Sequence, residues 1–326
     1  MSERDQNVPR QAPREPHLPH EDAVVSPPMR STQVQPRRQG SSRSDNARSA
    51  LQPGPLNMAF THVLLVTACI IFAFPIYWIV RISLQSGSTL LSTDFSIFPQ
   101  SPTLENYARV FETPFFWRSL LNSFIYAGGT TVVSLLLAVG AAYAYSRLRF
   151  RGRQTTLWAM ILLQAVPGIA TIVPLYVLFV NLDLINSYRG LIIAYTAGTL
   201  PFSIWMLKSY YDTIPRDLED AARVDGATTN QAFIYIMLPL ALPAVAITAM
   251  FGFVTGWTEF VLAVTFITSG ELYPLSVRLY SIIGERTTEW GFFAAMSIVF
   301  ALPVMIFFLV FQRFLVGGLT LGGVKG

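Results

Sequence analysis

Six long apolar runs follow residue 58, and they decide what this chain can fold into. They cover residues 59–84, 119–146, 155–179, 189–211, 241–267 and 291–315. A helix needs roughly 20 apolar residues to cross a bilayer, and each run reaches that length. The chain is only 13% charged, about half the share found in soluble domains. We therefore predict an all-α membrane protein with six transmembrane helices.

The placement of Lys and Arg predicts how these helices are oriented. Six spans put both chain ends on the same side of the membrane. If that side is the cytoplasm, it holds 17 basic residues against six on the other side, and the RLRFRGR cluster at 147–153 is decisive. Loops on the cytoplasmic side are enriched in Lys and Arg. We expect cytoplasmic N- and C-termini and a cytoplasmic loop at 212–240.

Residues 1–57 differ from the rest of the chain. They contain no aromatic residue and are rich in Pro, Arg, Ser and Gln. Such a segment buries too little apolar surface to offset the entropy lost on ordering. We predict a disordered cytoplasmic arm at 1–57 and a six-helix transmembrane domain at 58–326.

The sequence lacks the motifs of an enzyme. It contains no GxxxxGK[ST] phosphate loop and no HExxH, CxxC or GxSxG. We expect no catalytic residue and no metal site. If the protein moves a solute uphill, the energy comes from a partner.

Three residues inside the spans are candidates for a transport path. Glu259 is an intramembrane acid, and such residues are functional candidates by default. Trp257 and Tyr195 could stack on a solute in this path or hydrogen-bond to it. Both aromatic side chains could equally be interhelical packing, and Glu259 could be a structural hydrogen-bonding group.

The loop sequence TIPRDLEDAARVDGATTNQAFIYIMLP predicts a helix, a glycine turn and a second helix. Pro215 and the acids that follow it favour a helix start. Gly226 stands where a helix commonly ends, and Thr228 or Thr229 can cap the next one. Helical spacing gives one small apolar face, made of Leu218, Ala221, Ala222 and Val224. The acids invite an arginine-bearing partner, so we favour a docking element over a plain connecting loop.

The same loop resembles the "EAA" loop of permease subunits of bacterial ABC importers. The matching residues are Asp220-Ala221-Ala222-Arg223-Val224-Asp225-Gly226, followed by Ile236-Met237-Leu238-Pro239. Asp220 stands where the family usually has Glu, and Glu219 could share its role. The ending LVGGLTLGGVKG is similar to the smaller permease subunit of maltose/maltodextrin importers, and the resemblance covers residues 58–326.

The resemblance implies a type I ABC importer permease fold in the bacterial cytoplasmic (inner) membrane. It implies four kinds of partner: a second permease subunit, two ATPase subunits, an extracytoplasmic sugar-binding protein and membrane lipid, with no nucleic acid. ATP and Mg would be bound by the ATPase subunits, and this chain would bind no cofactor. The implied cargo is a maltose- or maltodextrin-like oligosaccharide. Alternatives are another sugar, such as trehalose or a sugar phosphate, or a stand-alone secondary transporter.

The family also implies site residues. The contact that couples the chain to the ATPase would be made by Glu219, Asp220, Ala221, Ala222, Asp225, Gly226 and Ala227. The C-terminal tail at 316–326 would insert between the ATPase subunits through Leu319, Thr320, Gly322, Gly323, Val324, Lys325 and Gly326. An outer loop at 268–290 would face the sugar-binding protein.

Overall fold

The structure is a computed structural model that describes residues 55–85, 97–99, 101–283 and 289–321. Over these residues the chain is helical, without a β-strand. It falls into two units, residues 1–64 and 65–326, and the side-chain contacts that build the site lie within the second. The predicted arm lies outside the described residues except for its last three, which begin the first helix at Pro55.

Four of the described helices are long and apolar enough to cross a membrane alone. They are α2 (Pro55–Ser83), α4 (Phe116–Arg147), α7 (Tyr188–Tyr211) and α14 (Trp290–Leu321). Two further spans are pairs of helices joined at a sharp bend, so the described residues provide up to six spans. The all-helical membrane fold predicted from the sequence is confirmed.

The third predicted span is one of these bent pairs. It consists of α5 (Arg153–Gln164) and α6 (Gly168–Asn181), which meet at 103°. Pro167 lies at the break with extended backbone (φ −55°, ψ 122°). Proline has no N–H to donate and its ring disfavours helical geometry in the preceding residue. The bend therefore follows directly from the sequence at this point.

The fifth predicted span, 241–267, is wrong as a single helix. The helix α11 (Leu242–Thr258) begins after a 74° bend from residues Thr229–Leu240 and stops at Thr258. A short helix, α12 (Val261–Phe266), follows. The residue at the break is Glu259, whose backbone is extended (φ −64°, ψ 128°).

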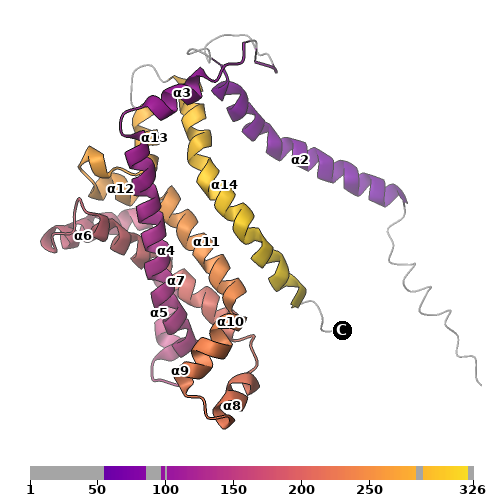
Figure 1. The fold of residues 1–326 in the computed structure, drawn as a ribbon, viewed down its shortest axis with the longest axis vertical. Helices are drawn as coiled ribbons and strands as arrows, with labels where there is room; N and C mark the ends of the chain where they lie inside the picture. The colour runs from indigo at the N-terminus through magenta and orange to yellow at the C-terminus, as the bar shows by residue number, and fades with distance from the viewer. Residues whose placement is uncertain (1–54, 86–96, 100, 284–288, 322–326) are drawn as a thin grey trace, which may run out of the picture. The chain divides into compact units, whose positions relative to one another are not determined.

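Helix α4 packs against both α7 and α11 (Figure 1). The two helices come close at Gly256, where an added Cβ would lie 2.9 Å from the Cα of Ala127. At Gly252 an added Cβ would lie 3.5 Å from the Cα of Thr131. Small residues let helix backbones come together where lipid supplies no hydrophobic driving force. The GxxxG pair therefore serves helix packing.

The shorter elements lie at the two ends of α4 (Figure 1). One end carries α3 (Glu105–Glu112), a 3₁₀ turn η3 (Gly270–Leu272) and α13 (Leu275–Ile283). The other end carries α8 (Asp217–Val224), α9 (Thr229–Ala232), a π-helical turn η2 (Phe233–Met237) and α10 (Leu238–Leu240). The structure thus separates the two predicted loops along the length of α4.

Candidate functional site: the α8 loop and the membrane cavity

Gly226 ends α8 in the way that the sequence predicts. Its φ is +91°, a conformation that glycine adopts readily. The N–H of Gly226 donates to the carbonyl O of Arg223 at 3.1 Å, and the N–H of Ala227 donates to that of Ala222 at 2.9 Å. These two bonds form a Schellman motif, which satisfies carbonyl groups left free at a helix end. The predicted glycine turn is confirmed.

Thr228 caps the second helix of the loop. Its Oγ1 accepts the N–H of Gln231 at 3.3 Å, while Oε1 of Gln231 accepts the N–H of Thr228 at 2.8 Å. This reciprocal capping box fixes where α9 begins. Met237, at the end of the following π-helical turn, is fully buried and ties the second helix to the bundle core. The predicted helix, turn and helix are all present.

The inner side of α8 is held to the end of α4 by a buried ion pair. Glu219 is only 2% exposed. Its carboxylate pairs with Nε of Arg147 and accepts a hydrogen bond from the hydroxyl of Tyr143 at 2.8 Å. Nη2 of Arg147 also donates to the carbonyl O of Ile214 at 2.8 Å, in the segment that leads into α8. The two carboxylate oxygens of Glu219 are therefore both engaged inside the chain.

A second polar network joins the ends of α4 and α7. The hydroxyl of Ser146 donates to Oδ1 of Asp212 at 2.7 Å, and Nζ of Lys208 lies 2.5 Å from Oδ2. Burial raises the pKa of Asp212, but the hydrogen bonds from Lys208 and Ser146 outweigh it and hold that pKa below its ordinary value. Asp212 therefore stays ionised near neutral pH and fixes the start of the α8 loop.

The opposite side of α8 is exposed, and we call it the outer face of α8. It consists of Asp217, Leu218, Asp220, Ala221, Val224 and Asp225. Val224 is 88% exposed, and Asp220 contacts Arg223 at 3.1 Å in an open surface pair. The single apolar face predicted from helical spacing is wrong in one member, because Ala222 points inward beside Glu219.

The two aromatic candidates for the path are packed inside the bundle. Trp257 is 1% exposed, donates its indole N–H to the carbonyl O of Phe300 at 3.0 Å and stacks on the Phe253 ring. Tyr195 is 3% exposed, and its hydroxyl lies 3.4 Å from the carbonyl O of Glu259. In this conformation both rings pack between helices, so contact with a sugar stays a prediction.

Glu259 shapes the backbone between α11 and α12. Its carboxylate accepts the N–H of Leu262 at 3.0 Å and that of Ala263 at 3.3 Å. These N–H groups belong to the first turn of α12 and have no partner within that helix. The structural alternative considered for this acid therefore has direct geometric support.

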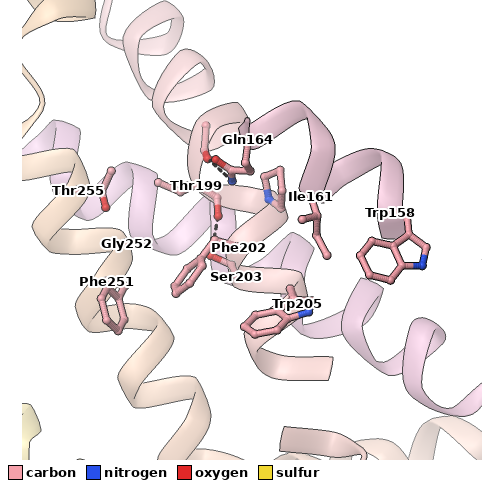
Figure 2. Close-up of a pocket in the computed structure, with 12 residues that line it drawn as sticks. Trp158, Ile161, Gln164, Thr199, Phe202, Ser203, Trp205, Phe251, Gly252 and Thr255 are labelled. Carbon is pink, nitrogen blue, oxygen red and sulfur yellow. Dashed lines mark hydrogen bonds between the residues drawn. The ribbon is translucent and has the colours of Figure 1, made fainter. Parts of the chain in front are cut away.

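A cavity of about 660 Å³ opens between α5, α7 and α11 (Figure 2). Its lining is mostly apolar and aromatic, with a few polar groups among the rings. Residues that line it include Trp158, Gln164, Thr199, Phe202, Trp205, Phe251 and Thr255. The side-chain amide of Gln164 donates to the carbonyl O of Gly198 at 3.2 Å. Sequence reasoning missed this site, although a glutamine inside an apolar run is a signal for it.

The predicted outer loop at 268–290 is fastened to α4 mainly by neutral groups, together with Nε of Arg278, which donates to Oγ of Ser119 at 3.3 Å. The amide of Asn122 donates to the carbonyl O of Tyr273 at 3.1 Å, and Oγ of Ser123 accepts the N–H of Leu275 at 2.7 Å. Asn122 and Ser123 are both fully or almost fully buried. These contacts hold the start of α13 at the end of α4 that lies away from α8.

The predicted tail falls at the limit of the described residues. Leu319 and Thr320 fall in the last turn of α14, and their side chains are not described. The tail residues from Gly322 to Gly326 lie outside the described residues. Within the described part of the chain, no three His, Cys, Asp or Glu side chains cluster in a way that could hold a metal ion.

Comparison with known proteins defines the class. Residues 113–320 match the family of binding-protein-dependent transport system inner membrane components, and the chain belongs to this family. The family membership and the apolar helices place it in the inner membrane as a multi-pass protein. A solved bacterial ABC transporter involved in the import of the acidic polysaccharide alginate shares its fold, with a TM-score of 0.70, 25% identity and coverage of 79% of this chain and 96% of that one.

Relatives of nearly full length are permease proteins. The galactooligosaccharide transport permease GanQ of Bacillus subtilis is 35% identical and covers 83% of this chain and 96% of its own length. The sulfoquinovosyl glycerol permease SmoH of Agrobacterium fabrum is 36% identical, with coverage of 83% and 94%. The maltose/maltodextrin permease MalG of Vibrio vulnificus is 36% identical, with coverage of 82% and 95%. The family predicted from the loop is confirmed.

Proposed function

We propose that this chain is the transmembrane permease subunit of an ATP-driven sugar importer and that an ATPase subunit docks on the outer face of α8. One observation carries the docking site: α8 is exposed on one side and anchored by a buried ion pair on the other. A helix of this kind can receive a partner and stay fixed to its own bundle. The family membership supports the transport role.

The chemistry of the outer face suits an arginine-bearing partner. Asp217, Asp220 and Asp225 offer carboxylates that accept charge-assisted hydrogen bonds. Ala221 adds little bulk between them, so a partner backbone can approach closely. Val224 adds an exposed apolar contact. We assign the docking carboxylate to Asp220, because Glu219 is engaged within the chain.

In this proposal the partner ATPase subunits bind ATP and Mg, and this chain binds no cofactor. The basic cluster at 147–153 supports a cytoplasmic location for the α8 end, since cytoplasmic loops carry more Lys and Arg. The chain termini lie on the same side. The remaining partners are a second permease subunit and a sugar-binding protein that meets the 268–290 loop. The tail at 316–326 reaches the ATPase subunits.

The proposed cargo is a di- or oligosaccharide, and maltodextrin is the first to test because the ending LVGGLTLGGVKG resembles maltose-type permeases. Relatives at 34–36% identity are named for maltodextrin, galactooligosaccharides, diacetylchitobiose and trehalose. These sequence identities are too similar to show which of the sugars this chain transports. Trehalose is the second candidate.

We propose that the cavity between α5, α7 and α11 lies along the transport path. Aromatic faces such as Trp158 and Trp205 can stack on sugar rings, and Gln164 and Thr199 can hydrogen-bond hydroxyl groups. This set replaces Tyr195 and Trp257 as our first choice for substrate contact. A Gln164→Ala variant with unchanged uptake and affinity would remove the cavity from the path.

The function is tested by purifying the tagged chain from its native membrane and identifying what comes with it. We expect a second permease and two copies of an ATPase. Proteoliposomes holding this complex, the binding protein and internal MgATP should accumulate labelled maltodextrin. Recovery of a lone oligomer that transports without ATP would instead favour a secondary transporter.

A further inference from the structure

Neighbouring acids of α8 have different surroundings. The side chain of Asp220 is 64% exposed, whereas that of Glu219 is 3% exposed and paired with Arg147. A buried carboxylate is strongly unfavourable unless a cation and further hydrogen bonds compensate it. Here Arg147 provides the cation and Tyr143 donates a further hydrogen bond. The inward position of Glu219 is therefore a specific arrangement and not an accident of helix rotation.

The guanidinium of Arg147 holds α8 at more than one point. Nε binds the carboxylate of Glu219, and Nη2 binds the backbone carbonyl of Ile214 ahead of the helix. Nη1 donates to the hydroxyl of Ser146 at 3.2 Å. Because the guanidinium is planar and its donors have fixed directions, these bonds set both the position and the rotation of α8 relative to the end of α4.

Helix α4 is suited to carry a movement across the membrane. It runs for 32 residues without a proline, whereas α2, α7 and α14 each contain one. At 1.5 Å per residue its length is about 48 Å, more than the thickness of the hydrocarbon core. Its far end holds the start of α13 through buried Asn122 and Ser123. A displacement of its Arg147 end therefore reaches the opposite side of the bundle.

We infer that Glu219 is a positioning residue: its pair with Arg147 makes α8 and α4 move as one body, so that closure of the docked ATPase subunits is delivered to the transport path. Asp220 contacts the ATPase subunit, and Glu219 transmits the movement of α8 to α4. This inference rests on the proposed function, because it assumes that α8 docks on an ATPase.

The test compares two variants: one removes the Glu219–Arg147 pair without leaving a buried charge, and the other is a matched control. In Glu219→Leu/Arg147→Met both charges are replaced by apolar groups, a change that buried pairs often tolerate in stability. The matched control, Lys208→Gln, removes a nearby ion pair at the end of α7 and leaves Asp212 bonded to Ser146. Each complex is purified, its assembly with the ATPase is quantified, and ATPase activity is measured with and without sugar-loaded binding protein.

We expect the apolar variant to assemble and keep its basal ATPase activity, but to lose at least about fivefold of the sugar-dependent stimulation, the lower end of typical coupling between sites. The control should keep its stimulation. Full stimulation in the apolar variant overturns the inference and leaves the proposed function standing. A wild-type chain that never assembles with an ATPase overturns the proposed function and this inference with it.

A second variant keeps the test decisive if the apolar pair does not assemble. Glu219→Gln/Arg147→Met also leaves no buried charge unpaired, and the Gln side chain can still accept the hydrogen bond from the Tyr143 hydroxyl. We expect normal assembly with reduced stimulation. Stimulation equal to wild type in Glu219→Gln/Arg147→Met overturns the transmitting role.

Discussion

The two ends of α4 are attached to their neighbours by different chemistry. At the α8 end, the attachment depends on a buried ion pair between Arg147 and Glu219. At the α13 end, buried neutral groups bind backbone atoms, such as Asn122 to the carbonyl of Glu271 at 2.8 Å. The first arrangement centres on one guanidinium, which binds both Glu219 and the carbonyl O of Ile214, while the second distributes its bonds over several side chains.

This difference predicts how each end responds to damage. Removing one partner of a buried ion pair leaves an uncompensated charge, which costs several kcal/mol. Removing one neutral hydrogen bond costs about 1–3 kcal/mol when its partner stays buried. A single substitution at the α8 end should therefore cost more stability than a single substitution at the α13 end. This difference fits an α8 end that transmits movement and an α13 end that holds a loop in place.

The largest effect is expected for Arg147→Ala. This change leaves Glu219 buried without its cation and frees the carbonyl of Ile214, at a cost of about 3–5 kcal/mol. Thermal unfolding of the detergent-solubilised protein should shift strongly downward. An unfolding temperature equal to that of Lys208→Gln would show that the pair is not buried in the solubilised protein.

A smaller effect is expected at the other end for Asn122→Ala. The change removes the donor to two loop carbonyls and the acceptor of the Tyr188 hydroxyl, at a cost of about 1–3 kcal/mol. Hydrogen–deuterium exchange should rise in residues 270–275 and stay unchanged in α8. Equal increases at both ends would contradict this separation of the two attachments.

The turn after α8 should respond next. Gly226→Val places a β-branched residue at φ +91°, where L-residues lose roughly 1–2 kcal/mol. An added Cβ meets no atom within 4 Å, so the effect comes from the backbone and not from a clash. Gly226→Asn is the control, because asparagine tolerates this conformation. Hydrogen–deuterium exchange in α8 should rise in Gly226→Val and stay near the wild-type level in Gly226→Asn. Wild-type exchange in both variants would show that the end of α8 does not depend on this backbone conformation.

The smallest effect is expected at the cap of α9. Thr228→Ala removes the N-cap oxygen and should cost about 1 kcal/mol. Thr229→Ala, one residue later, removes a hydroxyl that makes no capping bond and should change little. Amide hydrogen exchange in α9 is measured in both variants. An equal rise in the two would show that Thr228 is not the residue that caps α9.

The sequence predicts best where local chemistry decides the conformation. Gly226 and Thr228 each act within their own turn, and the turn and the cap are found where these residues stand. Four of the six apolar runs similarly give helices that can cross the membrane alone, whereas the third and fifth runs are interrupted. Such features are predictable because their cause lies within a few neighbouring residues.

Long-range contacts could not be predicted in this way. Glu219 and Asp220 are neighbours with the same charge, and the choice of which one turns inward is made by Arg147, 72 residues away in the chain. The break at Glu259 depends on a carboxylate that caps the next helix, in a run that composition predicts to continue. The cavity needs three helices to be placed together, which no single run encodes.

Cross-linking from the outer face of α8 tests the central claim most directly. In a Cys69→Ser background, Val224→Cys introduces a thiol at a position that is 88% exposed, and Leu104→Cys does so at the opposite end of α4, where exposure is 68%. Both variants are labelled with a thiol-reactive photo-cross-linker in the assembled complex. The account predicts that the ATPase subunit is captured from Val224→Cys and not from Leu104→Cys. Two results would contradict it: both cysteines are labelled equally but the ATPase subunit is not captured from Val224→Cys, or the ATPase subunit is captured from Leu104→Cys.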